Sequence, residues 1–289
     1  MSSSKSAPPP LPEPLAVAVA DSHTHLDMQD GTPEEGLAKA AAVGVTTVVQ
    51  VGCDLPGSRW AAELAAAHEQ VWAAVALHPN EAPRIVHGDS DGWSGQRRAP
   101  GGAAALDEAL AEIDALAALP QVRAVGETGL DYFRTGPEGV AVQHDSFRRH
   151  IAIAKRHGKA LVIHDREAHD DVLRILEEEG APERTVFHCY SGDAAMAKVC
   201  ADRGYYMSFA GNVTFNSAQP LRDALAAAPL DLLLVETDAP FLTPAPYRGR
   251  PNAPYLIPVT LRAMAKVKGV PEDELAAAVA ANTARAFDY

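Results

Sequence analysis

Two histidines separated by one residue, His23 and His25, follow the apolar residues 15–20 near the start of the chain. Side chains two residues apart lie on the same face of a β-strand, so these two imidazoles are expected to point the same way. Thr24 between them is then expected to point to the opposite face. Because neutral imidazole is a common ligand of divalent metal ions, the spacing predicts part of a metal site.

Other apolar stretches also end in a side chain of a type that binds metal ions. A single histidine at a strand end is more often a hydrogen-bonded structural residue than a ligand, but repeated placement indicates one polar site on an apolar scaffold. We interpret the pattern as that of a metal-dependent hydrolase. The residues concerned are His78, Glu127, His164, His188 and Asp238.

The remaining histidines and strand-end acids are expected to have structural roles. Asp54 and Asp131 are interpreted as helix-cap or loop acids. Histidines within segments of helical spacing are expected on solvated helix faces and are given no catalytic role. They are His68, His144, His150, His157 and His169.

Apolar β-type stretches alternate with segments of helical spacing along the chain. The stretches are apolar almost throughout, which is typical of a parallel sheet covered on both faces. Eightfold alternation predicts a closed α/β barrel of the (β/α)8 type, and an open doubly wound sheet is the alternative. Active sites of such barrels lie at the carboxyl ends of the strands, where the candidate ligands fall. Strands are predicted over residues 15–20, 46–51, 71–77, 122–126, 160–163, 185–187, 205–209 and 232–235.

Composition adds bounds on size and location. The chain has 289 residues, and its three cysteines form no CxxC pair, so a reducing cytoplasmic location is expected. No apolar stretch has the length of a membrane span, and the N-terminus lacks the pattern of a secretion signal. The Ser- and Pro-rich residues 1–14 are predicted to be a flexible tail before a single domain over residues 15–289. Residues 85–102 are predicted to be a long loop, either a lid or a surface insertion.

Several motifs resemble those of the TatD family of metal-dependent deoxyribonucleases, barrel enzymes of the amidohydrolase-like superfamily. Their order along most of the chain makes the resemblance specific. Ala253 is a departure, because the family commonly has Glu at this position. The motifs include DSHTHLD (21–27), ALHPN (76–80), VGETGLDYF (125–133), VFHCYSG (186–192) and VETDAPFLTP (235–244).

The resemblance implies two divalent metal ions, for which zinc, magnesium and manganese are the candidates. Two such ions would make a shared water acidic enough to attack a phosphate. Asp238 is the candidate for accepting the proton of that water. The implied ligands are His23, His25 and Asp238 for one ion and His164 and His188 for the other, with Glu127 as the bridge.

Further residues are predicted to support the ligands or contact a substrate. Glu236 lies two residues before Asp238 and is expected either to orient a ligand histidine or to form a structural ion pair. His78 and Arg166 are predicted substrate contacts, because the planar guanidinium of arginine suits a phosphate oxygen. Tyr132 and Phe133 are candidates for stacking on a base.

The charge balance limits the substrate that the resemblance implies. An excess of 38 acidic over 25 basic residues argues against a long DNA contact surface. A grip on a strand end needs few phosphate contacts, so we expect exonucleolytic attack on single strands or DNA fragments, with no membrane and no obligate protein partner. The alternatives are an amidohydrolase acting on a C–N or ester bond, which shares the His23 and His25 pattern, and a non-enzymatic metal-holding barrel.

Overall fold

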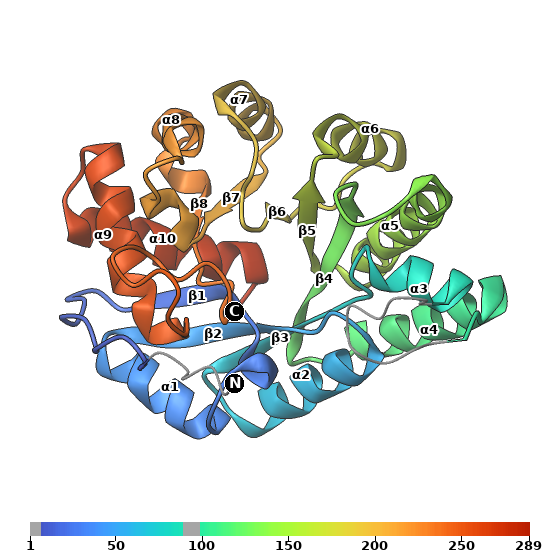
Figure 1. Ribbon diagram of the computed structural model, residues 1–289, viewed down its shortest axis with the longest axis horizontal. Coiled ribbons are helices and arrows are strands. Elements are labelled where there is room, and N and C mark those ends of the chain that lie inside the picture. The colour runs from blue at the N-terminus through green and yellow to red at the C-terminus, as the bar shows by residue number, and fades with distance from the viewer. Residues whose placement is uncertain (1–6, 89–98) are drawn as a thin grey trace, which may run out of the picture. The chain divides into compact units, whose positions relative to one another are not determined.

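The strands of the protein follow one another in the sheet in chain order, from β1 to β8. A computed structural model describes residues 7–88 and 99–289 (Figure 1). Helices alternate with the strands, so the predicted (β/α)8 class is confirmed. None of the helices in these two described ranges is long and apolar enough to cross a membrane. The chain divides into two compact units, unit 1 with Met1–Gln50 and Phe187–Tyr289 and unit 2 with Val51–Val186.

Unit 1 contains two pairs of parallel strands, β1 with β2 and β7 with β8. The chain after β8 continues beside the end of β1, where the Asp238 N–H donates to the His23 carbonyl and the His25 N–H donates to the Ala239 carbonyl, both over 2.9 Å. Helix α10 packs against β1 and β8 (Figure 1). The elements of unit 1 are β1 (Val19–Thr24), η1 (Leu26–Met28), α1 (Pro33–Ala42), β2 (Val45–Val51), whose last residue falls in unit 2, α7 (Ala194–Asp202), β7 (Tyr206–Phe209), η2 (Gly211–Thr214), α8 (Gln219–Ala227), η3 (Leu230–Leu232), β8 (Leu233–Val235), η4 (Pro254–Leu256), α9 (Ile257–Lys268) and α10 (Glu272–Phe287).

The first strand differs from the sequence prediction, which placed it over residues 15–20 and was wrong at both ends. The strand includes polar residues that are fully buried, and each has a partner. Asp21 accepts from the Thr237 N–H over 2.9 Å, and the hydroxyls of Ser22 and Ser208 lie 2.8 Å apart. Hydrogen bonds to distant segments therefore extend the strand beyond the apolar stretch.

The predicted N-terminal tail is described in part. Residues 1–6 lie outside the described residues. The Pro9 carbonyl accepts from the Tyr255 hydroxyl, and the Glu13 carbonyl accepts from the Arg262 guanidinium, both over 2.9 Å. Residues 9–13 therefore contact the C-terminal part of unit 1.

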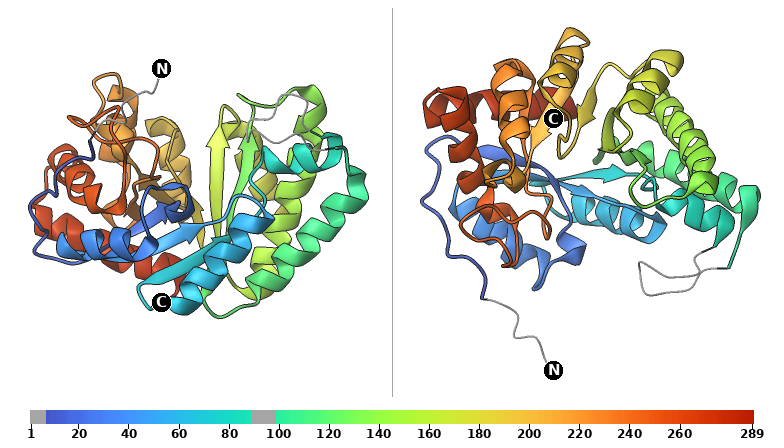
Figure 2. Two further views of the ribbon diagram at one scale, coloured as in Figure 1. Left: turned by 60° about the horizontal axis from the view of Figure 1, so that its bottom comes forward. Right: turned by 45° about the horizontal axis from the view of Figure 1, so that its top comes forward.

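Unit 2 contains the parallel pairs β3 with β4 and β4 with β5. Helix α2 packs against β3, and α4 and α5 run alongside β4 (Figure 2). Of the predicted loop 85–102, residues 89–98 lie outside the described residues, residues 85–87 belong to α3, and Gly102 begins α4. The elements are α2 (Leu55–Ala67), β3 (Val71–Val75), α3 (Glu81–His87), α4 (Gly102–Ala117), β4 (Val122–Asp131), α5 (Pro137–His157), β5 (Ala160–Arg166), α6 (His169–Glu179) and β6 (Thr185–Phe187), whose last residue falls in unit 1.

Strands β4 and β5 extend further than their apolar stretches predicted. Both continue through polar residues, so Glu127, His164 and Arg166 lie within strands. Gly129 makes the close pairing possible, since it lies opposite His164 with φ +128°. A Cβ atom at Gly129 would lie 2.2 Å from the His164 carbonyl oxygen. The glycine therefore fixes how closely β5 approaches β4 at His164.

His150 corrects another sequence prediction, because it is fully buried rather than on a solvated face of α5. Its Nε2 accepts from the Leu77 N–H over 3.1 Å, and its Nδ1 lies 2.7 Å from the Ser146 carbonyl oxygen. This pattern requires a neutral ring with the proton on Nδ1. Burial lowers the pKa of His150 from 6.5 to about 4. His150 thereby holds the backbone immediately before His78.

Burial of neutral His150 predicts a loss of stability in mild acid. The imidazole of His150 takes up a proton at higher pH in the unfolded chain than in the folded chain. Its contribution to the free energy of unfolding is therefore complete above pH 6.5 and is lost as the pH falls toward about 4. The loss should reach about 3 kcal/mol in the free energy of unfolding. Urea denaturation from pH 7 to pH 4 should show a steeper decline for the natural protein than for His150→Gln, and parallel curves would contradict the assignment.

Candidate metal centre

Five side chains with metal-binding atoms come together in unit 1. Within this unit 1 group, His23 Nε2 and His25 Nε2 lie 3.3 Å apart, and His25 Nε2 lies 3.6 Å from Asp238 Oδ1. Two overlapping sets each bring their ligand atoms within 4.8 Å of one another. The sets are His23, His25 and Asp238, and His23, His188 and Glu236.

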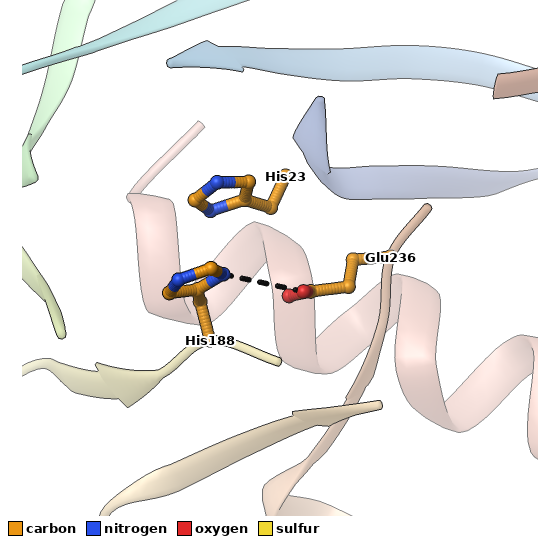
Figure 3. A group of neighbouring side chains, drawn as sticks. All are labelled: His23, His188 and Glu236. Atoms are coloured by element: carbon orange, nitrogen blue, oxygen red, sulfur yellow. Dashed lines mark hydrogen bonds and ion pairs between the residues drawn. The ribbon is translucent and has the colours of Figure 1, made fainter. Parts of the chain in front are cut away.

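Glu236 holds His188 in place within the unit 1 group (Figure 3). Glu236 is fully buried, and its Oε1 accepts from the Cys189 N–H over 2.8 Å and lies 3.3 Å from His188 Nδ1. A proton on Nδ1 then leaves the imidazole lone pair on Nε2. The His188 ring stacks on the His23 ring with 3.9 Å between centroids and 11° between planes. Of the two roles predicted for Glu236, this geometry fits the orientation of a ligand histidine.

Asp21 ties β1 to the chain segment that carries Glu236 and Asp238. Its Oδ1 accepts from the backbone N–H groups of Thr237 and His23, over 2.9 Å and 3.2 Å. Burial raises the pKa of Asp21 to about 8 despite these donors, and the nearby Glu236 carboxyl adds to the rise. Burial likewise raises the pKa of Glu236, while His188 opposes that shift. Burial in unit 1 therefore disfavours the charged form of both carboxyl groups, and a bound cation would favour that form.

Unit 2 has a second set of metal-binding atoms, formed by His78, Glu127 and His164. In this unit 2 group, Glu127 Oε2 lies 3.5 Å from His164 Nδ1, and Glu127 Oε1 lies 3.9 Å from His78 Nε2. The Cys53 thiol donates to Glu127 Oε1 over 3.2 Å. The buried carboxylate thus lies between two imidazoles and a thiol.

Asp131 and Asn80 decide where the two histidines of the unit 2 group carry their protons. Asp131 Oδ2 lies 3.3 Å from His164 Nε2, which favours a proton there and leaves the lone pair on Nδ1, facing Glu127. His78 Nδ1 accepts from the Asn80 N–H over 3.0 Å, so neutral His78 carries its proton on Nε2. His164 therefore suits a metal ligand, and His78 suits a hydrogen-bond donor to a substrate.

The role of Asp131 goes beyond the loop role predicted from the sequence. It does shape the turn, since its Oδ1 accepts from the Phe133 and Arg134 N–H groups over 3.0 Å and 3.1 Å. Burial favours a raised pKa for Asp131, but His164 and Asn80 together lower it below its ordinary value. The side-chain amide of Asn80 donates to Asp131 Oδ2 over 2.9 Å. Asp131 therefore stays charged beside His164.

Sequence reasoning missed Asp131, Asn80 and Cys53 as parts of the site. Asp131 carried a signal, because positions 127 and 131 share a face of an extended strand. Cys53 and Asn80 carried none, since their partners are distant in sequence. Asp54, by contrast, caps α2 as predicted, with Oδ1 accepting from the Gly57 N–H over 2.7 Å.

The other predicted substrate contacts, Tyr132 and Arg166, have different surroundings. The Tyr132 hydroxyl donates to Asp171 Oδ2 over 2.6 Å and lies 2.5 Å from His144 Nε2. Arg166 ends β5, two residues after His164, and its guanidinium lies over the Phe133 ring. The Tyr132 hydroxyl is therefore occupied by partners within the protein. Arg166 instead stacks on Phe133, which is more exposed than Tyr132.

Both groups offer ligands for a divalent ion. The unit 1 group combines imidazole nitrogens with carboxylate oxygens, and the unit 2 group combines His164 Nδ1 with Glu127, which suits zinc and admits manganese. Two of these histidines, His164 and His188, have a carboxylate at one ring nitrogen, which leaves the other nitrogen for a metal ion. The donor chemistry therefore agrees with a metal-dependent enzyme.

Comparison with known proteins places the chain in a family. A family model described as TatD related DNase matches residues 20–288. The metal-dependent hydrolase TatD of Mycobacterium tuberculosis, described as uncharacterized, is 43% identical over 275 residues, which cover 92% of this chain and 97% of the relative. YcfH of Escherichia coli, also described as an uncharacterized metal-dependent hydrolase, is 38% identical over 273 residues, which cover 92% and 94%.

A solved structure agrees with this placement. The crystal structure of YJJV, a TatD homologue from Escherichia coli, superposes with a TM-score of 0.81 at 28% identity, covering 94% of this chain and 98% of that one. The chain therefore belongs to the TatD-related DNase family. It is a metal-dependent hydrolase with a (β/α)8 fold.

The contact between Asp131 and His164 predicts that Asp131→Asn weakens metal binding. Asparagine keeps an oxygen at this position but removes the charge that favours the proton on His164 Nε2, so affinity for Zn²⁺ should fall about 10- to 100-fold. Isothermal titration of Zn²⁺ into the full-length protein, after a chelator has removed its metal ions, measures this affinity. Asp165→Asn is the matched control, because Asp165 is also buried and pairs with His169, which lies outside both groups. Equal affinities for the two variants would refute the role of Asp131.

Proposed function

We propose that the protein hydrolyses phosphodiester bonds of DNA, and that it removes nucleotides from the ends of single strands or fragments. The observation that supports this most is the unit 2 group, in which the buried carboxylate of Glu127 lies beside His164 and His78. His164 can bind a metal ion through Nδ1, and His78 can donate a hydrogen bond from Nε2. Many amidohydrolases carry a carbamylated lysine where this group has Glu127. The family description as a DNase supports the same substrate.

The proposed cofactors are two divalent ions, zinc, magnesium or manganese. When bound, such ions lower the pKa of a water molecule and neutralise charge on a phosphate. His23, His25 and Asp238 would hold one of them. The assignment of His164 and His188 to the other ion, with Glu127 as the bridge, joins residues of both units and stays a prediction from the resemblance.

The chain's own side chains supply the remaining steps. Asp238 is the proposed acceptor of the proton from the attacking water, because its Oδ1 lies within 3.9 Å of both His23 and His25 and 15% of its side chain is exposed. Glu236 keeps His188 oriented through Nδ1. His78 would donate from Nε2 to a phosphate oxygen of the substrate.

The acidic character of the protein fits a substrate that is bound through few phosphate contacts. A formal charge of −13 disfavours a long duplex contact, and a strand end needs few phosphate contacts. The predicted cytoplasmic location and the absence of an obligate protein partner stay predictions.

Chelation should abolish the proposed activity, because the proposed attack on phosphate needs a bound cation. We expect the chelated protein to leave labelled single-stranded DNA intact and to recover turnover after addition of Zn²⁺, Mn²⁺ or Mg²⁺. A panel of amides and esters assayed in parallel distinguishes a DNase from the alternative, an amidohydrolase. Undiminished DNA hydrolysis by protein shown to be metal-free, or turnover of amides alone, would overturn the proposal.

Replacing Glu127 with Gln should lower both metal content and rate. The change keeps the size of the side chain but removes its charge, so single-turnover DNA hydrolysis should fall by at least about 100-fold, the scale for loss of a central electrostatic stabiliser. Elemental analysis should show fewer bound ions per chain. Glu81→Gln is the control, since Glu81 and Glu127 are both 5% exposed but Glu81 pairs with Arg84. A Glu127→Gln variant with full metal content and normal rates would rule out the assigned role.

A further inference from the structure

An arginine lies over an exposed aromatic ring beside the unit 2 group. The guanidinium carbon of Arg166 is 3.9 Å from the ring centroid of Phe133, and that of Arg134 is 6.0 Å from it. Phe133 is 56% exposed, although it has one of the largest apolar side chains of the protein. The stacked pair therefore presents an aromatic ring and a cation to solvent side by side.

The charges around this ring differ from those around several other arginines of unit 2. Those arginines pair with carboxylates, for example Arg59 with Glu112, Arg149 with Asp107 and Arg156 with Asp114. Among residues 7–88 and 99–289, no ion pair involves Arg166 or Arg134. In a chain with 38 acidic and 25 basic residues, two arginines near the unit 2 group without a carboxylate partner in the described part of the chain provide a binding place for an anion.

The ring and the guanidinium are fixed next to the candidate ligand His164. Arg166 follows His164 by two residues in β5, so the two side chains share a face of the strand. The Tyr132 N–H donates to the Arg166 carbonyl over 2.9 Å. Asp131 accepts from the Phe133 N–H with one oxygen and contacts His164 with the other. One carboxylate therefore positions both the ligand and the ring.

We propose that Phe133 and Arg166 form a nucleotide platform, on which a base stacks against the ring while its phosphate binds the guanidinium. The proposal rests on the proposed function and names the part of the substrate that this site recognises. A planar base fits an exposed ring, and a phosphate fits the N–H groups of an arginine held by stacking. Stacking does not distinguish among bases, so the platform selects single-stranded ends without a preferred sequence.

The test measures binding of a strand that resists hydrolysis. Metal-loaded full-length protein is titrated into a fluorescein-labelled phosphorothioate single strand, and inorganic phosphate and deoxyadenosine monophosphate are used as competitors. Phe133→Ala should weaken binding of the strand at least about five-fold. The separate variant Phe133→Tyr should bind the strand like the natural protein, because tyrosine keeps the aromatic face. Arg166→Gln should also weaken binding and should reduce the dependence of log affinity on log salt concentration by about one contact.

Arg123→Gln provides the matched control. Arg123 also lies over an aromatic ring, 4.5 Å from the centroid of Trp72, but at the amino ends of β3 and β4. This variant should bind the strand like the natural protein. Equal binding by the Phe133→Ala and Arg123→Gln variants would overturn the platform, as would a natural protein that binds inorganic phosphate but no strand.

The outcomes separate the platform from the proposed function. If the natural protein binds the strand through Phe133 but hydrolyses no unmodified DNA, the proposed function fails and the platform stands. If it hydrolyses DNA and the Phe133 and Arg166 variants have unchanged affinity and KM, the platform fails and the proposed function stands.

Discussion

Burial of carboxyl groups is the constraint on which the rest of the structure depends, because a buried carboxyl group is stable only when hydrogen-bond partners surround it. Asp21 and Glu236 are fully buried, and their donors come from segments distant in sequence, Thr237 for the first and the Cys189 backbone for the second. Asp131 is held in the same way by Asn80. These contacts tie together different strands of the sheet and the segments that follow them. The hydrogen bonds that allow the acids to be buried therefore also place the candidate ligands.

The same acids decide the chemistry of the histidines. Glu236 and Asp131 each face one nitrogen of a histidine, so His188 presents Nε2 and His164 presents Nδ1 to a cation. His78 has the opposite arrangement, since the Asn80 N–H occupies its Nδ1 and leaves a donor at Nε2. Three imidazoles of one residue type thus acquire two roles through their partners alone. This division is the physical basis for treating His164 as a ligand and His78 as a contact to substrate.

The sequence predicted the alternation of strands and helices and the residue types at the strand ends, because both follow from local periodicity. It placed β1 too early, since the strand continues through buried polar residues whose partners, such as Thr237, are far along the chain. His150 was wrongly expected on a solvated face, because its contact with Leu77 joins residues 73 positions apart. Asn80 and Cys53 gave no signal for the same reason. Local patterns therefore predicted which elements carry the site, and long-range hydrogen bonds decided what each side chain does.

Anomalous diffraction from crystals grown with Zn²⁺ tests most directly the claim that these strand-end groups are metal ligands. We expect anomalous peaks beside the unit 1 group and the unit 2 group, with His164 bound through Nδ1 at about 2.0–2.1 Å and Asp131 still in contact with its Nε2. The account would be contradicted by full zinc occupancy at other residues only, or by His164 bound through Nε2 with Asp131 displaced.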